Sequence, residues 1–267
     1  SGVAYVTMNR PEVFNAFDEA MIAQLSELFD SIETNPEVRL VVLAGSGKHF
    51  SAGADLAWMQ RASEASQEWN LADARRFSNM LAKIADCSKP TIAKVQGAAL
   101  GGGVGLACAC DIALASDDAS FSVSEAKFGI LPAVIGPYVI QAVGKRQAKR
   151  LALTASRINA LEALSMGLVQ KVVARDALDA CVAETVKDLL IAGPQAQKEI
   201  KQLFAQIPVG MVTPEVRELT AQTISRVRTT DEAKAGFATL IDEAAKGEFV
   251  TITRHGKPAA VLVSVEA

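Results

Sequence analysis

The stretch PTIAKVQGAALGGGVGLACACDIALAS (residues 90–116) decides the fold. Residues 90–95, at its start, combine β-branched and apolar side chains and predict a buried strand. The glycine run at 101–103 comes next, followed by the apolar segment 104–110, which fits a short buried helix, and by residues 111–116, which predict another strand. Strand, glycine turn, helix and strand in this order are typical of α/β proteins with a largely parallel sheet.

The same order of elements is found upstream. Residues 2–8 predict a strand that ends at an Asn-Arg-Pro turn, and Asp18 is suited to cap the amphipathic helix that follows. Residues 39–44 predict a further buried strand. A glycine-punctuated loop then leads to a helix through about residues 71–86, so the front of the chain is predicted to alternate strands and helices.

The character of the sequence changes after Pro137. Apolar residues at helical spacing predict a mainly helical region, with helices over residues 138–154, 161–166, 178–191 and 195–205. Asn159 is suited to cap the short helix of this group and Gly167 to end it. The last part of the chain predicts a helix over 231–246 and a β-hairpin whose strands are 248–254 and 259–265.

Composition argues against several kinds of partner and site. The 267 residues hold 27 Lys and Arg against 30 Asp and Glu, a net charge of −3 that disfavours nucleic acid and anionic membrane surfaces as partners. The four cysteines lack CxxC spacing and predict reduced thiols, which favours the cytoplasm. No membrane span or signal peptide is predicted. The sequence has only two histidines, which disfavours a zinc site and a histidine-based catalytic triad.

Two glycine-rich loops follow predicted strands, at residues 49–55 and 97–103. One interpretation is that their glycines only allow tight turns and close packing. Neither loop has a dinucleotide or Walker motif, so a phosphate cradle is not supported. The functional interpretation is that Ala54 and Gly102 each offer a backbone N–H, the latter at a helix start, and that the two donors form an oxyanion hole.

Glu125 is the candidate acid or base, although an isolated glutamate near a lysine is by spacing alone more typical of the surface. Its segment belongs to a set of motifs that together resemble the crotonase, or enoyl-CoA hydratase/isomerase, superfamily: NRPEVFNAF (9–17), FSAGADL (50–56), GAALGGG (97–103), CDIALAS (110–116) and SEAKFGILPA (124–133). The resemblance runs from about Gly2 to Phe237 and includes RINALEALSMGLVQKVV (157–173). Within the superfamily, ADLAWM (54–59), GGGVGL (101–106) and LPAVIGPYV (131–139) are similar to bacterial methylglutaconyl-CoA and isohexenylglutaconyl-CoA hydratases of leucine and acyclic terpene breakdown.

This resemblance implies an α/β fold in which residues 1–195 form a spiral of ββα units and residues 196–240 a helical trimerisation region. It implies a lyase acting on an acyl-CoA, with no cofactor beyond the coenzyme A of the substrate, and assembly into homotrimers or hexamers. Glu125 then becomes the catalytic residue, and the N–H groups of Ala54 and Gly102 hold the thioester oxygen. The implied substrate-binding residues are Ala52, Asp55, Leu56, Gly101, Gly105 and Pro132.

One departure from the family pattern bears on the reaction. Many hydratases of the superfamily carry two glutamates twenty positions apart; the later corresponds to Glu125 and the earlier to Gly105, so one carboxylate is missing. A single glutamate suffices for hydration if the proton taken from water is the one delivered to Cα. Single-glutamate members also include double-bond isomerases, so isomerase is the alternative activity.

Residues 241–267 depart from the superfamily. With the residues just before them they resemble Phd-type antitoxins, in which a helix precedes a hairpin similar to VTITRHGKPAAVLV (250–263). The alternative interpretation is a fused packing or dimerisation piece. Residues 231–267 hold six acidic and four basic residues and lack the opening strand of antitoxins, so DNA binding and a toxin partner are disfavoured. An inactive body with an interaction tail is the third hypothesis for the whole chain.

Overall fold

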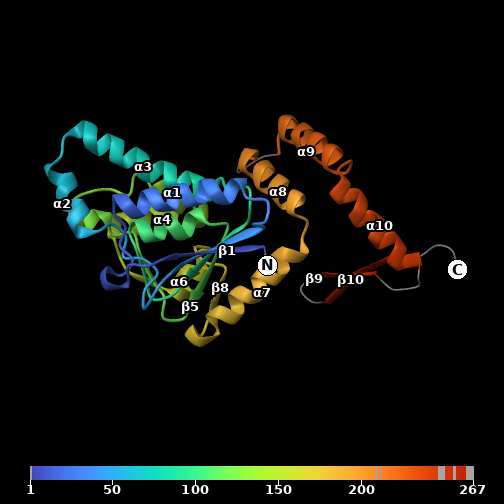
Figure 1. Ribbon diagram of the computed structural model, residues 1–267, viewed down its shortest axis with the longest axis horizontal. Helices are drawn as coiled ribbons and strands as arrows, with labels where there is room; N and C mark the ends of the chain where they lie inside the picture. The colour runs from blue at the N-terminus through green and yellow to red at the C-terminus, as the bar shows by residue number, and fades with distance from the viewer. Residues whose placement is uncertain (1, 209, 211, 246–249, 255–256, 263–267) are drawn as a thin grey trace. The chain divides into compact units, whose positions relative to one another are not determined.

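The computed structural model describes the backbone of residues 2–208, 210, 212–245, 250–254 and 257–262, and side chains up to residue 239. The chain divides into two compact units, Ser1–Pro194 and Gln195–Ala267 (Figure 1). Among the helices so described, none is both long enough and apolar enough to cross a membrane.

The first unit is built on a five-stranded sheet in the order β1-β2-β3-β5-β8. Its strands are β1 (Val3–Met8), β2 (Leu40–Gly45), β3 (Thr91–Val95), β5 (Ile112–Ser116) and β8 (Lys171–Val173). Every neighbouring pair is parallel, and parallel neighbours need crossover connections, which the helices provide. The predicted α/β class with a parallel sheet is confirmed.

A second sheet makes the fold a spiral. It joins β4 (Ala98–Leu100) in parallel to β6 (Ser120–Ser122), and β6 in antiparallel to β7 (Ile158–Asn159). After β3 in the first sheet the chain forms β4 in the second and then α4 (Gly102–Ala109). After β5 it forms β6 and, beyond a 3-10 turn at Glu125–Phe128, α5 (Gly136–Thr154). Strand, strand and helix thus recur, as the resemblance implied.

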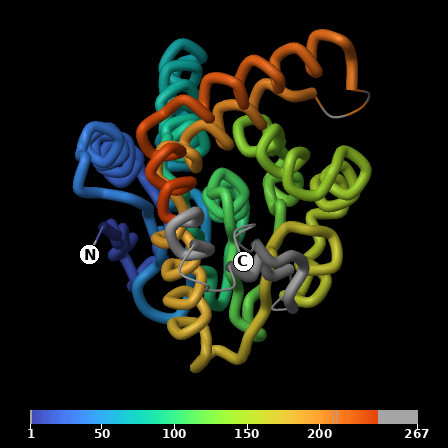
Figure 2. The backbone as a smooth tube through the Cα atoms, turned by 90° about the vertical axis from the view of Figure 1, so that its right-hand side faces the viewer, coloured from blue at the N-terminus to red at the C-terminus, as the bar shows by residue number. Residues whose placement is uncertain are grey.

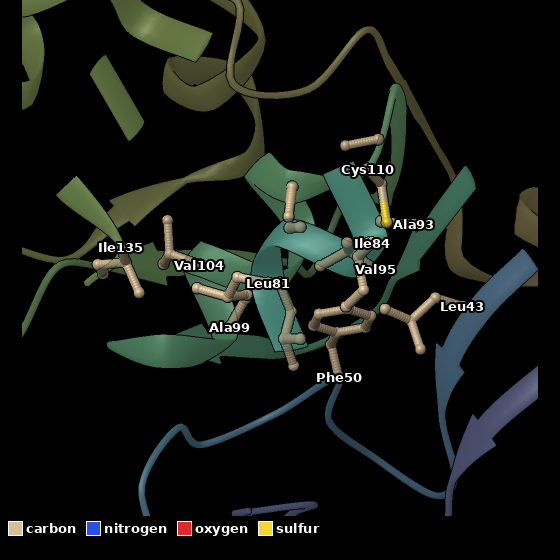
Figure 3. Packing of buried hydrophobic residues seen from close by; sticks show 14 of the residues in the cluster. Leu43, Phe50, Leu81, Ile84, Ala93, Val95, Ala99, Val104, Cys110 and Ile135 are labelled. Carbon is tan, nitrogen blue, oxygen red and sulfur yellow. The ribbon is translucent and has the colours of Figure 1, made fainter. Parts of the chain in front are cut away.

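At its central strands β2, β3 and β5 the sheet is buried on both faces, to which neighbouring residues of a strand point in turn. Val41 and Leu43 of β2 pack with α1 (Glu19–Thr34), α3 (Gln67–Ala85) and α4, and part of this cluster is drawn in Figure 3. Leu40 and Val42 pack instead with apolar side chains of α7 (Leu178–Ile191).

Helix α4 is enclosed within this first unit. Its residues are apolar all round, as expected of a helix with no solvent face, and α3 and α5 contact it (Figure 2). Small side chains such as Ala99 of β4, which is fully buried, let the surrounding elements approach it closely. Helix α4 is therefore packed against other elements on several sides.

The helix ends show which local predictions were correct. Asp18 caps α1 by accepting from the Met21 N–H at 3.0 Å, and Asn159 forms a capping box with Glu162 at the start of α6 (Ala160–Ser165). In α5, Gly144 has φ +75 and interrupts the helix, which the sequence pattern did not predict.

Helix α2 (Leu56–Glu64) lies in a segment that sequence analysis assigned to a loop. Only Trp58 of its nine residues is buried, so there is too little apolar periodicity to reveal it. Helix α2 is capped by the side chain of Asp55, which accepts hydrogen bonds from the N–H groups of Ala57 and Trp58.

The second unit contains α8 (Pro194–Gln206, whose first residue belongs to the first unit), α9 (Pro214–Val227), α10 (Asp231–Ala245), β9 (Val250–Arg254) and β10 (Lys257–Leu262). The Glu232 carboxylate accepts from the N–H groups of Gln195 and Ala196, which ties α10 to the start of α8. Strands β9 and β10 pair in antiparallel fashion, so the predicted hairpin is confirmed in its backbone. Of the turn predicted at 255–258, residues 257 and 258 belong instead to β10. The remaining turn residues 255–256 and the predicted strand ends 248–249 and 263–265 lie outside the described residues.

Candidate active site

Glu125 begins the 3-10 turn that follows β6. A Cβ atom built on Gly101 would lie 3.3 Å from Glu125 Oε1, so the carboxyl group lies against the residue that precedes α4. Glu125 Oε2 is buried and has no hydrogen-bond partner among the described residues. Burial raises the pKa of the Glu125 carboxyl above its ordinary value, and a hydrogen bond from its own backbone N–H offsets only part of this rise. A raised pKa makes the carboxylate a stronger base and brings it closer to the working pH at which one group can both take and give a proton.

The loops that carry Ala54 and Gly102 are in contact. Residues 51 and 99 form a parallel bridge, in which the Ser51 N–H donates to Ala98 O at 3.1 Å and the Leu100 N–H to Ser51 O at 2.9 Å. A Cβ on Gly53, whose φ is +84, would lie only 3.2 Å from the Gly102 nitrogen. The two glycine-rich loops that sequence analysis selected therefore meet beside the start of α4.

Hydrogen bonds to Phe17 fix the direction of the Ala54 N–H. The Phe17 N–H donates to Gly53 O at 2.8 Å, and the Asp55 N–H donates to Phe17 O at 3.0 Å. Because successive peptide groups of an extended segment point to opposite sides, the Ala54 N–H points away from Phe17. Gly102 is the first residue of α4, where N–H groups have no intrahelical acceptor and the helix dipole is positive.

Close packing around α4 leaves no room for side chains at its glycines. A Cβ on Gly102 would lie 2.2 Å from Phe17 Cζ, and a Cβ on Gly105 would lie 2.3 Å from Ile135 Cγ2. Gly105 donates its N–H to Gly101 O at 3.3 Å, so the two glycines lie one turn apart on one side of the helix. Ile135, which is 2% exposed, thus fills the space of a side chain at position 105, one helical turn along from Gly101, against which the Glu125 carboxyl lies.

Two buried polar residues, Asn15 and Ser51, fix the 50–55 loop through hydrogen bonds. Asn15, fully buried and at φ +55, donates its side-chain amide to Ser46 O and His49 O, each at 2.8 Å. Ser51 Oγ donates to Asn15 O at 2.9 Å and accepts from the Gly53 N–H at 3.1 Å. Sequence analysis did not single out either residue, because their role depends on partners distant in the chain.

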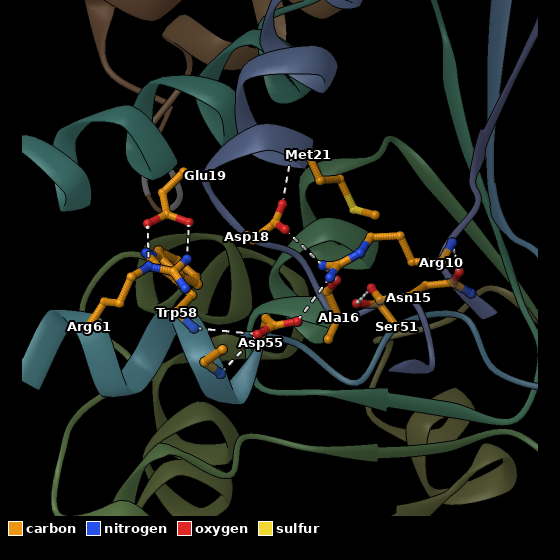
Figure 4. Close-up of polar contacts among 11 residues, drawn as sticks. Arg10, Asn15, Ala16, Asp18, Glu19, Met21, Ser51, Asp55, Trp58 and Arg61 are labelled. Atoms are coloured by element: carbon orange, nitrogen blue, oxygen red, sulfur yellow. Dashed lines mark hydrogen bonds and ion pairs between the residues drawn. The ribbon is translucent and has the colours of Figure 1, made fainter. Parts of the chain in front are cut away.

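Arg10 links the caps of two helices (Figure 4). Its guanidinium lies 3.1 Å from Asp55 Oδ2 and 3.2 Å from Asp18 Oδ2, and it donates to Ala16 O at 2.7 Å. Burial alone would raise the pKa of Asp55, but hydrogen bonds from Ala57, Trp58 and Arg10 together hold it below its ordinary value. The Asp55 carboxylate is therefore hydrogen-bonded within the protein, and its role as a substrate-binding residue stays a prediction.

The structure gives local contacts and exposures for the other predicted binding residues, whose role stays a prediction. The Ala52 N–H donates to Phe14 O, Pro132 O accepts from the Gly136 N–H, and the Leu56 side chain is 76% exposed. Three exposed apolar side chains that sequence analysis missed, Phe128, Ile130 and Leu131, follow Glu125 directly.

Other concave and polar sites lie away from Glu125. A groove of 550 Å³ runs between α1 and α3, and a cavity of 370 Å³ lies at the C-terminal end of α4; Glu125 lines neither.

Within the described part of the chain, no three His, Cys, Asp or Glu side chains cluster in a way that could hold a metal ion. Burial and the cations Lys48, Arg175 and Arg157 lower the pKa of His49, whose Nδ1 accepts from the Ala98 N–H at 3.0 Å.

The family model described as enoyl-CoA hydratase/isomerase matches residues 1–249. The match therefore continues beyond Phe237, where sequence analysis ended the resemblance. A putative enoyl-CoA hydratase of Thermus thermophilus is 34% identical over 245 residues, which cover 90% of this chain and 95% of that protein. The (E)-benzylidenesuccinyl-CoA hydratase of Thauera aromatica is 35% identical over 212 residues, or 78% and 81% of the two chains. The crystal structure of an enoyl-CoA hydratase from Shewanella pealeana superposes with a TM-score of 0.88 at 37% identity, covering 91% of each chain.

Proposed function

This chain belongs to the enoyl-CoA hydratase/isomerase family, and we propose that it adds water to an α,β-unsaturated acyl-CoA whose acyl group is branched and of the glutaconyl type. Members of this family are enzymes. The observation that carries the proposal is the burial of the Glu125 carboxyl against Gly101, beside the start of α4. A carboxyl group at this place can move a proton while negative charge develops on an oxygen near the positive end of the helix.

In the proposed complex the thioester oxygen accepts hydrogen bonds from the Ala54 and Gly102 N–H groups. The contact of their two loops and the direction of the Ala54 N–H support this arrangement. Preorganised backbone donors stabilise an enolate oxygen more than the neutral carbonyl, and a single such donor contributes on the order of 3 kcal/mol in other oxyanion holes. The fixed packing of α4 means that these donors need no rearrangement during the reaction.

Glu125 moves one proton in two directions. Its carboxylate takes a proton from water as the water oxygen bonds to Cβ, and the electron pair of the double bond moves toward the thioester oxygen to form the enolate. The resulting carboxylic acid then gives its proton to Cα, the carbonyl re-forms and Glu125 returns to the carboxylate. One water is consumed, one hydroxyacyl-CoA is formed, and a single carboxyl group is sufficient.

The choice of a branched, glutaconyl-type acyl group has two supports. Three local motifs are similar to those of glutaconyl-CoA hydratases, and the Thauera relative is named for benzylidenesuccinyl-CoA, a substituted acyl group derived from a dicarboxylic acid. Exposed Phe128, Ile130 and Leu131 follow Glu125 and offer apolar surface that suits a branched chain.

Isomerisation is the second candidate function, and Ile135 favours it. The place of a side chain at position 105 is filled by hydrocarbon, so Glu125 has no carboxylate partner at that position. In an isomerase the same carboxyl group would remove a proton from one allylic carbon and return it to another.

A panel of enoyl-CoA thioesters in ¹⁸O-labelled water tests the proposal. Hydration predicts loss of the enoyl absorbance and one labelled oxygen at Cβ of the product, with branched glutaconyl-type substrates giving the highest kcat/KM. Isomerisation predicts a shifted double bond and hydrogen exchange without ¹⁸O. An absence of turnover over the whole panel would contradict both and would favour an inactive body with an interaction tail.

The second unit is proposed to serve assembly rather than chemistry. We propose that residues 196–240 mediate a homotrimer or hexamer and that 241–267 form a packing or interaction piece. The similarity of this tail to Phd-type antitoxins makes a toxin pull-down and a salt-dependent DNA-binding assay the direct tests of that origin. Reduced cysteines support a cytoplasmic location.

A further inference from the structure

We infer that Arg10 is a positioning residue for the Ala54 N–H and that it acts through Asp55. The inference rests on the proposed oxyanion role of Ala54. What identifies Arg10 is its place between the caps of α1 and α2, directly beside the residue that follows Ala54.

One guanidinium serves three acceptors from two segments. Arg10 Nη2 donates to Asp55 Oδ2 at 3.1 Å, while Nη1 donates to Ala16 O at 2.7 Å and lies 3.2 Å from Asp18 Oδ2. The planar fork of arginine can meet these acceptors together, whereas the single ammonium group of lysine cannot reproduce the arrangement. Its side chain is 29% exposed, so solvent screens the ion pairs only in part.

Asp55 transmits this constraint to the neighbouring peptide. Its Oδ1 accepts from the Ala57 and Trp58 N–H groups and its own N–H donates to Phe17 O, so the residue is fixed at side chain and backbone alike. Without the Arg10 charge, the carboxylates of Asp18 and Asp55 would lose their common cation and repel each other. The Ala54–Asp55 segment would relax, and a donor misplaced by about 1 Å can cost on the order of 100-fold in rate.

The structure offers a matched control in Arg61. This residue of α2 pairs with Glu19 of α1 through contacts of 2.6 and 3.3 Å, so it ties together the same two helices as Arg10. The Arg61 side chain is 54% exposed, and neither Arg61 nor Glu19 is a chain neighbour of Ala54. A role that consisted only of joining α1 to α2 would make the two arginines equivalent.

The experiment compares Arg10→Gln, Arg10→Lys and Arg61→Gln in the full-length protein. It measures kcat and KM on the best enoyl-CoA substrate, the melting temperature, and the absorbance shift of a bound aryl-enoyl-CoA, whose chromophore reports polarisation of the thioester carbonyl. We expect Arg10→Gln to lower kcat by roughly 10- to 100-fold with little change in KM and to reduce the absorbance shift. Arg10→Lys should be intermediate, and Arg61→Gln should match the wild type in both kcat and absorbance shift.

The outcomes separate this inference from the function on which it rests. If the wild type polarises and turns over an enoyl-CoA but Arg10→Gln loses no more kcat or absorbance shift than Arg61→Gln, Arg10 does not position the donor. If Arg10→Gln does not fold, the same comparison between Arg10→Lys and Arg61→Gln decides, with an unchanged absorbance shift counting against the inference. If the wild type itself neither binds nor converts any enoyl-CoA, the proposed function fails and the inference fails with it.

Discussion

Replacement of Gly105 by alanine is expected to destabilise the protein through a clash with Ile135. The new Cβ would lie 2.3 Å from Ile135 Cγ2 and 2.8 Å from Ile135 Cβ, whereas carbon atoms in favourable contact are about 3.5–4.0 Å apart. Ile135 would have to retreat by roughly 1 Å within a close-packed core. Overpacking of this kind costs about 1–3 kcal/mol. From a mid-range cost of about 2 kcal/mol, the better helix propensity of alanine returns up to about 1 kcal/mol, so the expected net loss is about 1–2 kcal/mol.

Denaturant-induced and thermal unfolding measure this loss, which corresponds to a lower melting temperature by about 2–4 °C per kcal/mol at this chain length. The matched control is Gly136→Ala in the first turn of α5, because a Cβ there would meet nothing within 4 Å. That variant should be as stable as the wild type or slightly more stable. A double-mutant cycle adds Ile135→Ala, which removes Cγ2 and leaves space for a small adjustment of the remaining Cβ. Gly105→Ala should cost less in that background.

Wild-type stability of Gly105→Ala would refute the reasoning, because Ile135 would then not fill the space beside position 105. The result bears on the chemistry of the site. If the cycle behaves as expected, a second carboxylate cannot be restored by Gly105→Glu alone, and a smaller residue at 135 is required with it. The single-carboxylate character of the site would then be a property of its packing.

Three further predictions concern chemistry, titration and assembly. Glu125→Gln should lower kcat at least 100-fold while coenzyme A inhibits it as strongly as the wild type; near-wild-type turnover would remove Glu125 from the mechanism. Because burial raises the pKa of Glu125, protonation of the catalytic base should reduce kcat/KM at pH values above the range of an ordinary carboxyl group, and an acid limb with the pKa of an ordinary glutamate would contradict this. Deletion of residues 242–267 should change the oligomeric state or solubility, measured by light scattering, and leave kcat within a few-fold of wild type; loss of turnover in an intact oligomer would place the tail in the reaction site.

The raised pKa of Glu125 also has a consequence for stability. A carboxyl group whose pKa is higher in the folded than in the unfolded protein favours folding below its unfolded pKa, and that advantage is lost as pH rises through the folded pKa. The ionised form is then buried at a cost. Glu125→Gln removes this cost, so its melting temperature should exceed that of the wild type at pH 8 by more than it does at pH 5. An equal difference at both pH values would mean that the carboxyl group is not desolvated.

Sequence patterns predicted the features that depend on neighbours in the chain. The alternation of strands and helices, the caps at Asp18 and Asn159 and the backbone hairpin of the tail follow from local periodicity and short-range hydrogen bonds. Helix α2 was missed because a cap at Asp55 supports it and only one of its residues is buried. The contacts of Phe17 with Gly102 and of Ile135 with Gly105 were also missed, since they join residues far apart in the chain and carry no motif of their own.

The candidate oxyanion hole illustrates why such contacts matter more than the identity of the donors. A backbone N–H is present at every residue except proline, so replacing the Ala54 side chain tests its role poorly. What distinguishes this N–H is its orientation, which depends on the Phe17 bridge and on Asp55, and Asp55 in turn contacts Arg10.

The second proposed donor, Gly102, is constrained by the ring of Phe17, which touches the start of α4. Phe17 therefore contacts the segments that carry both proposed donors, the residues on either side of Ala54 by its backbone and Gly102 by its ring. Phe17→Leu keeps the backbone bridge and removes only the ring, so it should disturb the Gly102 donor while leaving the Ala54 donor in place. We expect Phe17→Leu to reduce the absorbance shift of the bound aryl-enoyl-CoA. We also expect Arg10→Gln to reduce that shift by the same further amount in Phe17→Leu as in the wild type. If Arg10→Gln has no further effect in Phe17→Leu, the two donors are not positioned independently.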